Sequence, residues 1–363
     1  MKVLLCSPKG NTGGIAKWTS HILDYYSQNV HDVDMKWCYA APSKREMIDT
    51  TPLLIRLYYG LANYVPFLKA LRKELKTEKY DVVHFVSSAH ISLIRDILTL
   101  WICRSRKAPA VVHFRFGRIP ELFKQKNWEY RLLVKVMRKS SKVVVIDKKS
   151  YDTLIDNGYK NIYLLPNPVA PKLATIIELH KDITRKPRTL LFAGHCIPTK
   201  GVFELVDACK EIQDIHLRII GICDDAMRDE LYRRAGEKAK DWMEIMGNQP
   251  YEEVIRQMLS CAIFVLPTYT EGFPNVIIES MACACPIVTT PVGAIPEMLD
   301  IYGENPYGIT VPVQDAVALK KEIEKLLSDE SFAIGMGKRA QQRVNKKYSM
   351  PAVWQKLMEI WNS

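Results

Sequence analysis

The stretch RTLLFAGHCIPTKGVFEL, residues 188–205, combines a short apolar run, a loop with glycine at 194 and 201, and the start of a second apolar segment. The run 188–193 is typical of a strand buried on both faces, and Lys200 and Gly201 stand where a helix is expected to start. A strand, a loop and a helix make one βα unit, and such units build parallel sheets covered by helices. The stretch therefore predicts an α/β fold.

Similar units recur along all 363 residues. The strands expected in the two halves are 2–7, 81–86, 110–114, 142–146 and 161–165, and then 188–193, 216–221, 262–267, 286–290 and 308–312. Four prolines between 166 and 187 indicate a linker, so each half is expected to form its own doubly wound, Rossmann-like parallel sheet. We expect an N-terminal domain at 1–170, a C-terminal domain at 171–345, and a final helix at 346–363 that crosses back to the first domain.

The composition is that of a globular chain. It is 48% hydrophobic, and a prior of roughly 150 residues per domain agrees with two domains. The first apolar run ends at Pro8, too early for a signal peptide, and no uncharged apolar stretch of about 18 residues follows. Nine cysteines without a C-x-x-C pair favour buried thiols over disulfides or zinc. We expect a cytoplasmic protein.

Charge is shared unevenly between the halves. Residues 1–170 hold 28 Lys and Arg against 14 Asp and Glu, a net of +14, whereas residues 171–363 hold 23 against 26, a net of −3. A basic half indicates an anionic partner, such as lipid headgroups or a phosphorylated acceptor. Ordinary solvated lysines are the alternative.

Two loops are candidates for binding phosphate. In SPKGNTGGIAKW, residues 7–18, Gly13 and Gly14 precede a predicted helix whose free N–H groups point into the loop; a tight turn explains the glycines equally well. Lys200 stands at the next such helix start, where it can add point charge to a diphosphate. A solvated lysine is the alternative there.

A third candidate is EGFPNVIIE, residues 271–279. Glu271 is expected in a loop after strand 262–267, and Glu279 about a turn and a half into a helix that Pro274 can begin. This separation argues against a shared proton. Because a carboxylate can accept hydrogen bonds from two sugar hydroxyls, the pair suits a ligand with a hydroxylated group on each side of a phosphate, such as a nucleotide sugar.

These residues resemble glycosyltransferase family 4, a family of retaining enzymes with the GT-B fold. The resemblance covers almost the whole chain and is carried by TGGI (12–15), LPNPV (165–169), FAGHCIPTKG (192–201), EGFPNVIIESMA (271–282) and CPIVTTPVGAIPEML (285–299). It implies two Rossmann-like domains that face each other across a cleft. It also implies a nucleotide-sugar donor and no cofactor.

The resemblance assigns roles to single residues. It implies that Glu271 contacts the donor sugar and that Glu279 holds the ribose. It also implies that backbone N–H groups of Gly272, Phe273 and Asn275 surround the sugar and the phosphate. The family binds the diphosphate with an arginine and a lysine five residues apart. Here the lysine is Lys200, but His195 stands in place of the arginine, and an imidazole is charged only in part near neutral pH.

The resemblance also implies a histidine near the reacting carbon, at the end of strand 110–114. The sequence there is VVHFRFGRIPEL, so His113 and Arg115 are both candidates for the catalytic position, and Arg118 is expected near the acceptor or a phosphate. A histidine inside the strand is the alternative for His113. His84 and His90 receive no role.

The departing diphosphate can be stabilised by Lys200 and by the amides of Gly13 and Gly14, so no obligatory metal is expected. The acidic D-x-D pattern occurs only at 32–34, where a strand edge away from the site is expected. Retention fits attack by the acceptor on the face that the diphosphate leaves, with Glu271 positioning the sugar. The base is expected to contact the backbone of Met246, Gly247 and Asn248, and because backbone groups carry no side-chain code, the sequence does not say whether the donor is a UDP- or a GDP-sugar.

The predicted reaction is transfer of a hexose-type sugar to a hydroxyl acceptor in cell-surface polysaccharide, lipopolysaccharide or glycolipid synthesis. The acceptor is a saccharide or is linked to lipid, and no nucleic acid is expected. The segment 52–76 mixes apolar and basic residues, so it suits either an anionic membrane surface or the core. The alternatives for the whole chain are a nucleotide-sugar epimerase of the same architecture and a non-enzymatic protein that binds anionic membranes.

Overall fold

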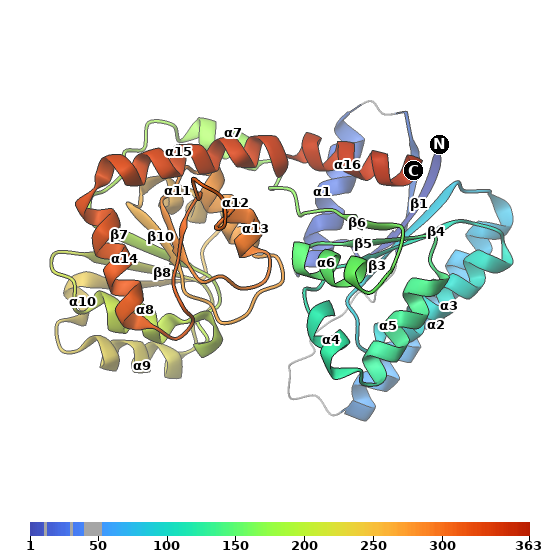
Figure 1. The fold of residues 1–363 in the computed structure, drawn as a ribbon, viewed down its shortest axis with the longest axis horizontal. Coiled ribbons are helices and arrows are strands. Elements are labelled where there is room, and N and C mark those ends of the chain that lie inside the picture. Colours follow the sequence, from blue (N-terminus) through green and yellow to red (C-terminus); the bar gives the residue numbers. More distant parts are fainter. Residues whose placement is uncertain (11–12, 30–31, 40–52) are drawn as a thin grey trace. The chain divides into compact units, whose positions relative to one another are not determined.

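A computed structural model of the protein describes residues 1–10, 13–29, 32–39 and 53–363. The chain forms two compact units (Figure 1). The N-terminal unit consists of Met1–Asn167 together with Trp354–Ser363, and the C-terminal unit consists of Pro168–Val353. The last ten residues of the chain therefore pack with its first half.

The N-terminal unit is built on a six-stranded parallel sheet with the strand order β2-β1-β3-β4-β5-β6. Its central strand β3 is buried at every residue, as expected for a strand covered by helices on both faces. The strands are β1 (Lys2–Ser7), β2 (Asp34–Tyr39), β3 (Val82–Ser87), β4 (Ala110–Phe114), β5 (Lys142–Val145) and β6 (Ile162–Leu164). The helices are α1 (Gly14–Gln28), α2 (Leu53–Thr77), α3 (Ser92–Ser105), α4 (Ile119–Gln125), α5 (Trp128–Lys139), α6 (Lys148–Asp156) and α16 (Met350–Asn362).

The C-terminal unit has a second six-stranded parallel sheet, with the order β12-β11-β10-β7-β8-β9. Its strands are β7 (Thr189–Ala193), β8 (His216–Ile220), β9 (Met243–Gly247), β10 (Ile263–Leu266), β11 (Ile287–Thr289) and β12 (Ile309–Thr310). Its helices are α7 (Leu173–Leu179), α8 (Val202–Cys209), α9 (Asp225–Ala235), α10 (Ala239–Trp242), α11 (Tyr251–Ser260), α12 (Asn275–Ala282), α13 (Ile295–Leu299), α14 (Ala316–Ser328) and α15 (Glu330–Lys347), with a 3-10 turn η1 at Pro198–Lys200. Both sheets confirm the predicted α/β class.

The structure adds two strands to those predicted: β2, of which the sequence indicated only a strand edge at 32–34, and β9. Both β2 and β9 lie at an edge of their sheet, and most residues of each are exposed or half-buried. An edge strand needs apolar residues on fewer sides than a central one, so its sequence carries a weaker signal. The central strands, by contrast, lie where the apolar runs predicted them.

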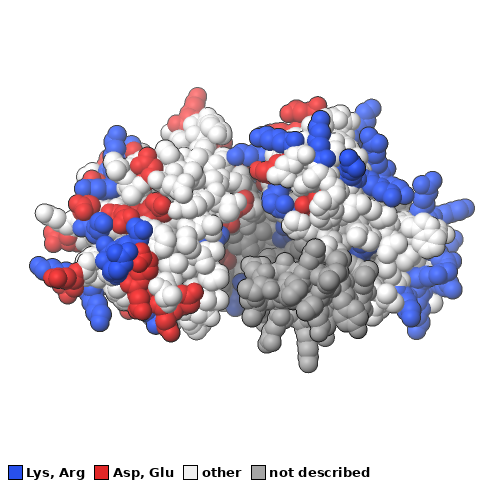
Figure 2. All heavy atoms as spheres, turned by 90° about the horizontal axis from the view of Figure 1, so that it is seen from below, with Lys and Arg blue, Asp and Glu red and all other residues white. Residues whose placement is uncertain are grey.

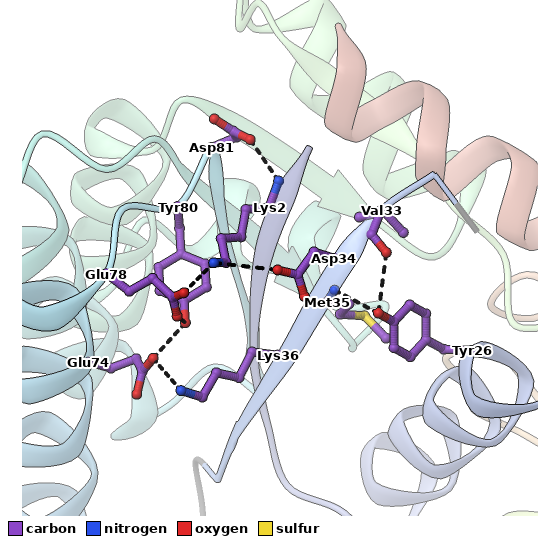
Figure 3. A network of polar contacts seen from close by, with 10 residues as sticks. All are labelled: Lys2, Tyr26, Val33, Asp34, Met35, Lys36, Glu74, Glu78, Tyr80 and Asp81. Carbon is purple, nitrogen blue, oxygen red and sulfur yellow. Dashed lines mark hydrogen bonds and ion pairs between the residues drawn. The ribbon is translucent and has the colours of Figure 1, made fainter. Parts of the chain in front are cut away.

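A polar network ties the edge strand β2 to its neighbours (Figure 3). Lys2 of β1 lies 3.4 Å from Asp34, Lys36 pairs with Glu74 of α2 at 2.7 Å, and the Tyr80 hydroxyl donates to Glu74 at 2.6 Å. Burial and the nearby carboxylates raise the pKa of Tyr80 well above its ordinary value. Asp34, one acid of the D-x-D pattern, thus begins β2 at the amino edge of the sheet. No three His, Cys, Asp or Glu side chains gather into a metal site within the described ranges.

Candidate functional site

The residues predicted to hold a donor lie along one edge of the C-terminal sheet. Strands β10, β7, β8 and β9 are neighbours in that order. The loop with Glu271 follows β10, the loop with Lys200 follows β7, and β9 ends in the predicted base-contacting residues Met246, Gly247 and Asn248. Adjacent strands are about 4.8 Å apart, so β10 and β9 are separated by about 14 Å. This row of strand ends suits an extended ligand, because ligands of such sheets bind outside the carboxyl ends of the strands.

Lys200 and Glu271 form an ion pair, with Lys200 Nζ 2.5 Å from Glu271 Oε1. The side chains are 24% and 13% exposed, so solvent screens the pair only in part. The two residues are 71 positions apart, and nothing in the sequence indicated that they touch. In the free protein, the cation predicted to hold a diphosphate is therefore engaged by the carboxylate predicted to hold a sugar.

Two glycines let the site loops approach each other. Gly201 has φ +70° and begins α8, and a Cβ there would lie 2.0 Å from the Pro267 carbonyl oxygen. Gly293 has φ +56°, and its Cβ would lie 2.3 Å from the Glu271 carbonyl oxygen. Since a contact this short forces backbone to move, only glycine fits at either position. The loop with Glu271 is thus held between the Lys200 loop and the loop before α13.

Helix α12 begins at Asn275, one residue after the expected Pro274, whose ψ of 105° lies outside the helical region. No side chain caps the helix, although the N–H of Ile277 in its first turn already donates to the Pro274 carbonyl at 3.1 Å. Phe273 turns its ring onto Tyr348, at a centroid distance of 6.1 Å, which leaves the backbone of Gly272 and Phe273 beside the helix start. This arrangement suits an anionic group.

Glu279 lies half-buried on α12, next to Tyr251 of α11. Burial and the Glu279 carboxylate raise the pKa of Tyr251 well above its ordinary value. His195, the residue in place of the family arginine, is exposed directly after β7, and its carbonyl accepts a hydrogen bond from Ile197. Both predicted residues therefore stand on the same strand-end edge as Lys200.

In the N-terminal unit, α1 starts without a side-chain cap. Gly13 has φ +80° at the N-cap, and Gly14 is the first helical residue. A Cβ at either glycine would meet no atom within 4 Å, so the space above the helix start is open. The predicted phosphate loop thus places a helix start without a side-chain cap beside that space, while Asn11 and Thr12 of the motif lie outside the described residues.

His113 is fully buried inside β4, the position that the alternative of a histidine inside the strand describes. Trp361 donates from Nε1 to His84 Nδ1 at 2.9 Å, and His84 Nε2 lies 3.3 Å from His113 Nδ1. Because indole only donates, His84 carries its proton on Nε2 and donates to His113. Burial, with a smaller effect of Arg115, lowers the pKa of His84 to about 3 and holds that of His113 well below its ordinary value. Both rings are neutral parts of the interior.

Arg115, the first residue after β4, is the catalytic candidate that remains. Its guanidinium lies 4.9 Å from the ring centroid of Trp18, which belongs to the second turn of α1. Its Nε and Nη1 are buried, and neither has a hydrogen-bond partner within the described residues. Burial lowers the pKa of Arg115 to about 9. A half-buried cation with two unused buried nitrogens, stacked on Trp18 one turn into α1, is suited to binding an anion.

Arg118 belongs to a separate cluster at the ends of β3 and β4. The buried Glu129 carboxylate accepts from Arg118 Nη2 at 3.0 Å and from the backbone N–H of His90 at 2.9 Å, and it lies 3.1 Å from His90 Nδ1. Arg118 also donates to His90 Nε2 at 3.0 Å. Ala89 and His90 both adopt positive φ, an unfavourable conformation for non-glycine residues. Glu129 thus fixes an exposed arginine and histidine; sequence reasoning missed it because only the fold brings it there.

Two family models match consecutive parts of the chain. The model described as Glycosyltransferase Family 4 matches residues 12–173, and the model described as Glycosyl transferases group 1 matches residues 176–343. Their shared border falls where the two compact units meet in the sequence.

Curated relatives match about half of the chain. An uncharacterised glycosyltransferase of Methanocaldococcus jannaschii is 31% identical over 166 residues, which cover 46% of this chain and 44% of the relative. The capsular polysaccharide biosynthesis glycosyltransferase CapM of Staphylococcus aureus is 30% identical over 184 residues, 47% of this chain and 45% of the relative. The match thus spans less than half the length of each.

Solved structures match along the whole chain. The HepE protein of Anabaena, determined in complex with UDP, has a TM-score of 0.73 and 17% identity, with all of both chains covered. A sucrose-phosphate synthase of Thermosynechococcus elongatus has a TM-score of 0.71 and 19% identity, with 99% of this chain and 98% of the other covered. At these identities the likeness establishes the fold, which is the predicted GT-B architecture.

Proposed function

Because the chain belongs to glycosyltransferase family 4, we propose that it transfers a hexose-type sugar from a nucleotide-diphosphate sugar to a hydroxyl group of an acceptor. The observation that carries the proposal is the Lys200–Glu271 ion pair in the row of strand ends from β10 to β9. The pair brings a cation suited to a diphosphate next to a carboxylate suited to a sugar. In a nucleotide sugar, the diphosphate and the sugar are likewise adjacent, because they are directly bonded to each other.

In the proposed complex, the donor replaces the ion pair. Lys200 turns to the diphosphate, and Glu271 accepts hydrogen bonds from the sugar hydroxyls. The first turn of α12 supplies N–H groups to a phosphate, Glu279 binds the ribose, and the base lies against the end of β9. Both partners of the broken pair thus gain a new partner, which keeps the cost of separating them low.

The chemical step breaks the bond between the anomeric carbon and the diphosphate oxygen, which leaves with the electron pair. The acceptor oxygen bonds to the anomeric carbon on the same face, and its proton passes to the departing diphosphate, so configuration is retained. Lys200 stabilises the developing charge without a metal ion. To Arg115 and the α1 helix start at Gly13 and Gly14 we assign binding of an anionic group of the substrates.

The acceptor class is inferred from relatives and from the Arg118 cluster. CapM is named for capsular polysaccharide biosynthesis, and a Campylobacter jejuni relative, 27% identical over 169 residues, is named for transfer to a sugar on diphospho-undecaprenol. We assign this chain to cell-surface polysaccharide or glycolipid synthesis. Arg118 and His90, fixed by Glu129, then contact a charged group of the acceptor.

The test is a panel of UDP- and GDP-sugars, with binding measured by calorimetry and slow hydrolysis measured without acceptor. One nucleotide family is expected to bind and raise the unfolding temperature. Formation of a different sugar nucleotide without any acceptor would identify an epimerase instead. Absence of any response to either nucleotide family, for a folded protein, would rule out the transferase.

A further inference from the structure

Helix α3 exposes an apolar stripe. Ile94, Leu98 and Trp101 are 39%, 42% and 62% exposed. Their spacing of four and three residues places them on one face of the helix. The other exposed residues of α3 are Arg104 and Ser105, at its C-terminal end. Scattered apolar residues are ordinary on a protein surface, whereas a stripe that fills the outer face of a helix indicates a partner.

The two helices that pack beside α3 carry cations on their exposed sides. Helix α2 lies along one side of α3 and α5 along the other (Figure 1). We call the outer surface of these three helices the α3 face. Its exposed cations are Lys69, Arg72, Lys73 and Lys76 on α2, Arg131, Lys135, Arg138 and Lys139 on α5, and Arg104, Arg106 and Lys107 at the end of α3. An apolar centre is thus flanked by positive charge.

The acids of the same helices are turned away from the α3 face. Among the described residues, each helix contains one acid. Glu74 of α2 is half-buried and pairs with Lys36, Asp96 of α3 is buried against Arg95, and Glu129 of α5 is buried in the Arg118 cluster. Figure 2 shows Lys and Arg predominating over the N-terminal unit, whereas both signs mix over the C-terminal unit. Within the described part of these three helices, the acids thus pair elsewhere and leave the flanking cations of the α3 face without a carboxylate from the same helices.

We propose that the α3 face docks onto an anionic phospholipid bilayer, with Ile94, Leu98 and Trp101 inserted at the level of the headgroups. A bilayer offers negative charge at its surface and an apolar layer beneath, which is the order of groups that this face presents. Tryptophan favours that boundary, and Trp128 at the start of α5 is also exposed. A second copy of the chain does not fit, because it would bring the same cations together.

The docking is peripheral. No helix among residues 1–10, 13–29, 32–39 and 53–363 has the length and apolar character that a membrane crossing requires. The inference rests on the composition of the surface and not on the proposed activity, so the two can fail separately. On the sequence alone, the segment 52–76 was a candidate for membrane contact. The basic side chains of that segment that lie on the α3 face remain contacts with the membrane, and α3 provides the apolar contact instead.

The experiment measures co-flotation of the full-length protein with extruded vesicles, without nucleotide. The vesicles are phosphatidylcholine alone, or phosphatidylcholine mixed equally with phosphatidylglycerol. Binding is expected only to the anionic vesicles, with tryptophan fluorescence shifting to shorter wavelength. Trp101→Ser should weaken it about tenfold, because it removes the largest apolar contact. The matched control Phe332→Ser, at a residue 43% exposed on α15, should leave binding unchanged.

Charge-reversal variants distinguish binding through the α3 face from non-specific adsorption to vesicles. The double variant Lys135→Glu with Arg138→Glu should lower binding to anionic vesicles at least about tenfold. The double variant Lys338→Glu with Lys346→Glu changes net charge equally in the C-terminal unit and should have little effect. Equal losses in both, or equal binding to both vesicle types, would overturn the proposal. So would a dimer in light scattering that Trp101→Ser converts to monomer while vesicle binding persists.

Discussion

The Lys200–Glu271 ion pair makes an unusual prediction about binding of the nucleotide alone. A nucleoside diphosphate has no sugar for Glu271 to hold, yet it must detach Lys200 from Glu271 to use the ammonium. Glu271→Gln removes the competing charge. We therefore expect this variant to bind UDP or GDP more tightly than the parent protein, while it transfers sugar about a hundredfold more slowly for lack of the carboxylate.

The size of the effect follows from the geometry. At 2.5 Å, with side chains 24% and 13% exposed, the pair lies between a surface ion pair and a buried one, and after allowance for screening it is worth about 1 kcal/mol. Its removal should therefore tighten nucleotide binding about fivefold. Lys200→Ala removes a charge-assisted hydrogen bond worth about 1.5–3 kcal/mol, so it should weaken binding about 10- to 150-fold.

The assay is isothermal calorimetry with the preferred nucleoside diphosphate. The matched control is Lys210→Ala, which breaks a 3.0 Å ion pair with Asp207 on α8, away from the strand ends, and should leave affinity unchanged. The essential result is that the two variants change nucleotide affinity in opposite directions: Glu271→Gln raises it and Lys200→Ala lowers it. If Glu271→Gln weakens nucleotide binding as strongly as Lys200→Ala, the two residues do not exchange partners and the reasoning is wrong.

Four further predictions concern the remaining site. Arg115→Met should raise the unfolding temperature, because two buried guanidinium nitrogens without a partner are removed, and should lower transfer about a hundredfold; lower stability would contradict the burial argument. The pKa of His84, about 3, lies below its unfolded value, so its contribution to stability is complete above about pH 6.5 and is lost as pH falls toward 3, by up to about 1.4 kcal/mol per pH unit. The depressed pKa of His113 adds a loss of the same sign as pH falls. Urea unfolding across this range should show the loss, and a flat profile would mean charged rings. His195→Arg should preserve or improve donor affinity in calorimetry, and a large loss would show another task for the imidazole. Transfer should persist in EDTA, and its loss with recovery on adding Mg²⁺ would show a metal requirement.

The fold was predictable where burial is complete. Strands such as β3 and β7 are apolar at nearly every residue, because helices cover both faces of a parallel sheet. Strands β2 and β9 were missed because each has one free edge and carries polar residues such as Asp34 and Glu244. The other two edge strands, β6 and β12, were predicted at 161–165 and 308–312, so a free edge alone does not hide a strand; the polar residues of β2 and β9 do.

The candidate site was predictable in its positions but not in its contacts. Lys200 and Glu271 were placed on one edge because each follows a recognisable strand, and parallel strands end on the same side. Gly247 joins them only in the structure, because it ends β9, a strand that was not predicted. The Lys200–Glu271 pair and the Glu129 carboxylate depend on side chains that meet only in the folded chain. For His113 and Arg115 the uncertainty was a matter of two residues: the end of β4 separates an interior position from one at the edge.

The α3 face shows why an interaction surface can escape a sequence that contains all its residues. Buried Leu93 and Leu100 alternate with exposed Ile94 and Trp101, so α3 is apolar on nearly every side, a pattern usually interpreted as a helix inside the core. The structure leaves its outer side uncovered, and it turns Asp96 inward against Arg95. The net charge of the chain could not reveal this surface, because a buried carboxylate and an exposed one contribute equally to net charge. An exposed apolar helix that is flanked by cations and whose acid is buried is therefore suited to binding an anionic membrane. The net charge of the N-terminal half indicated only that its partner is anionic.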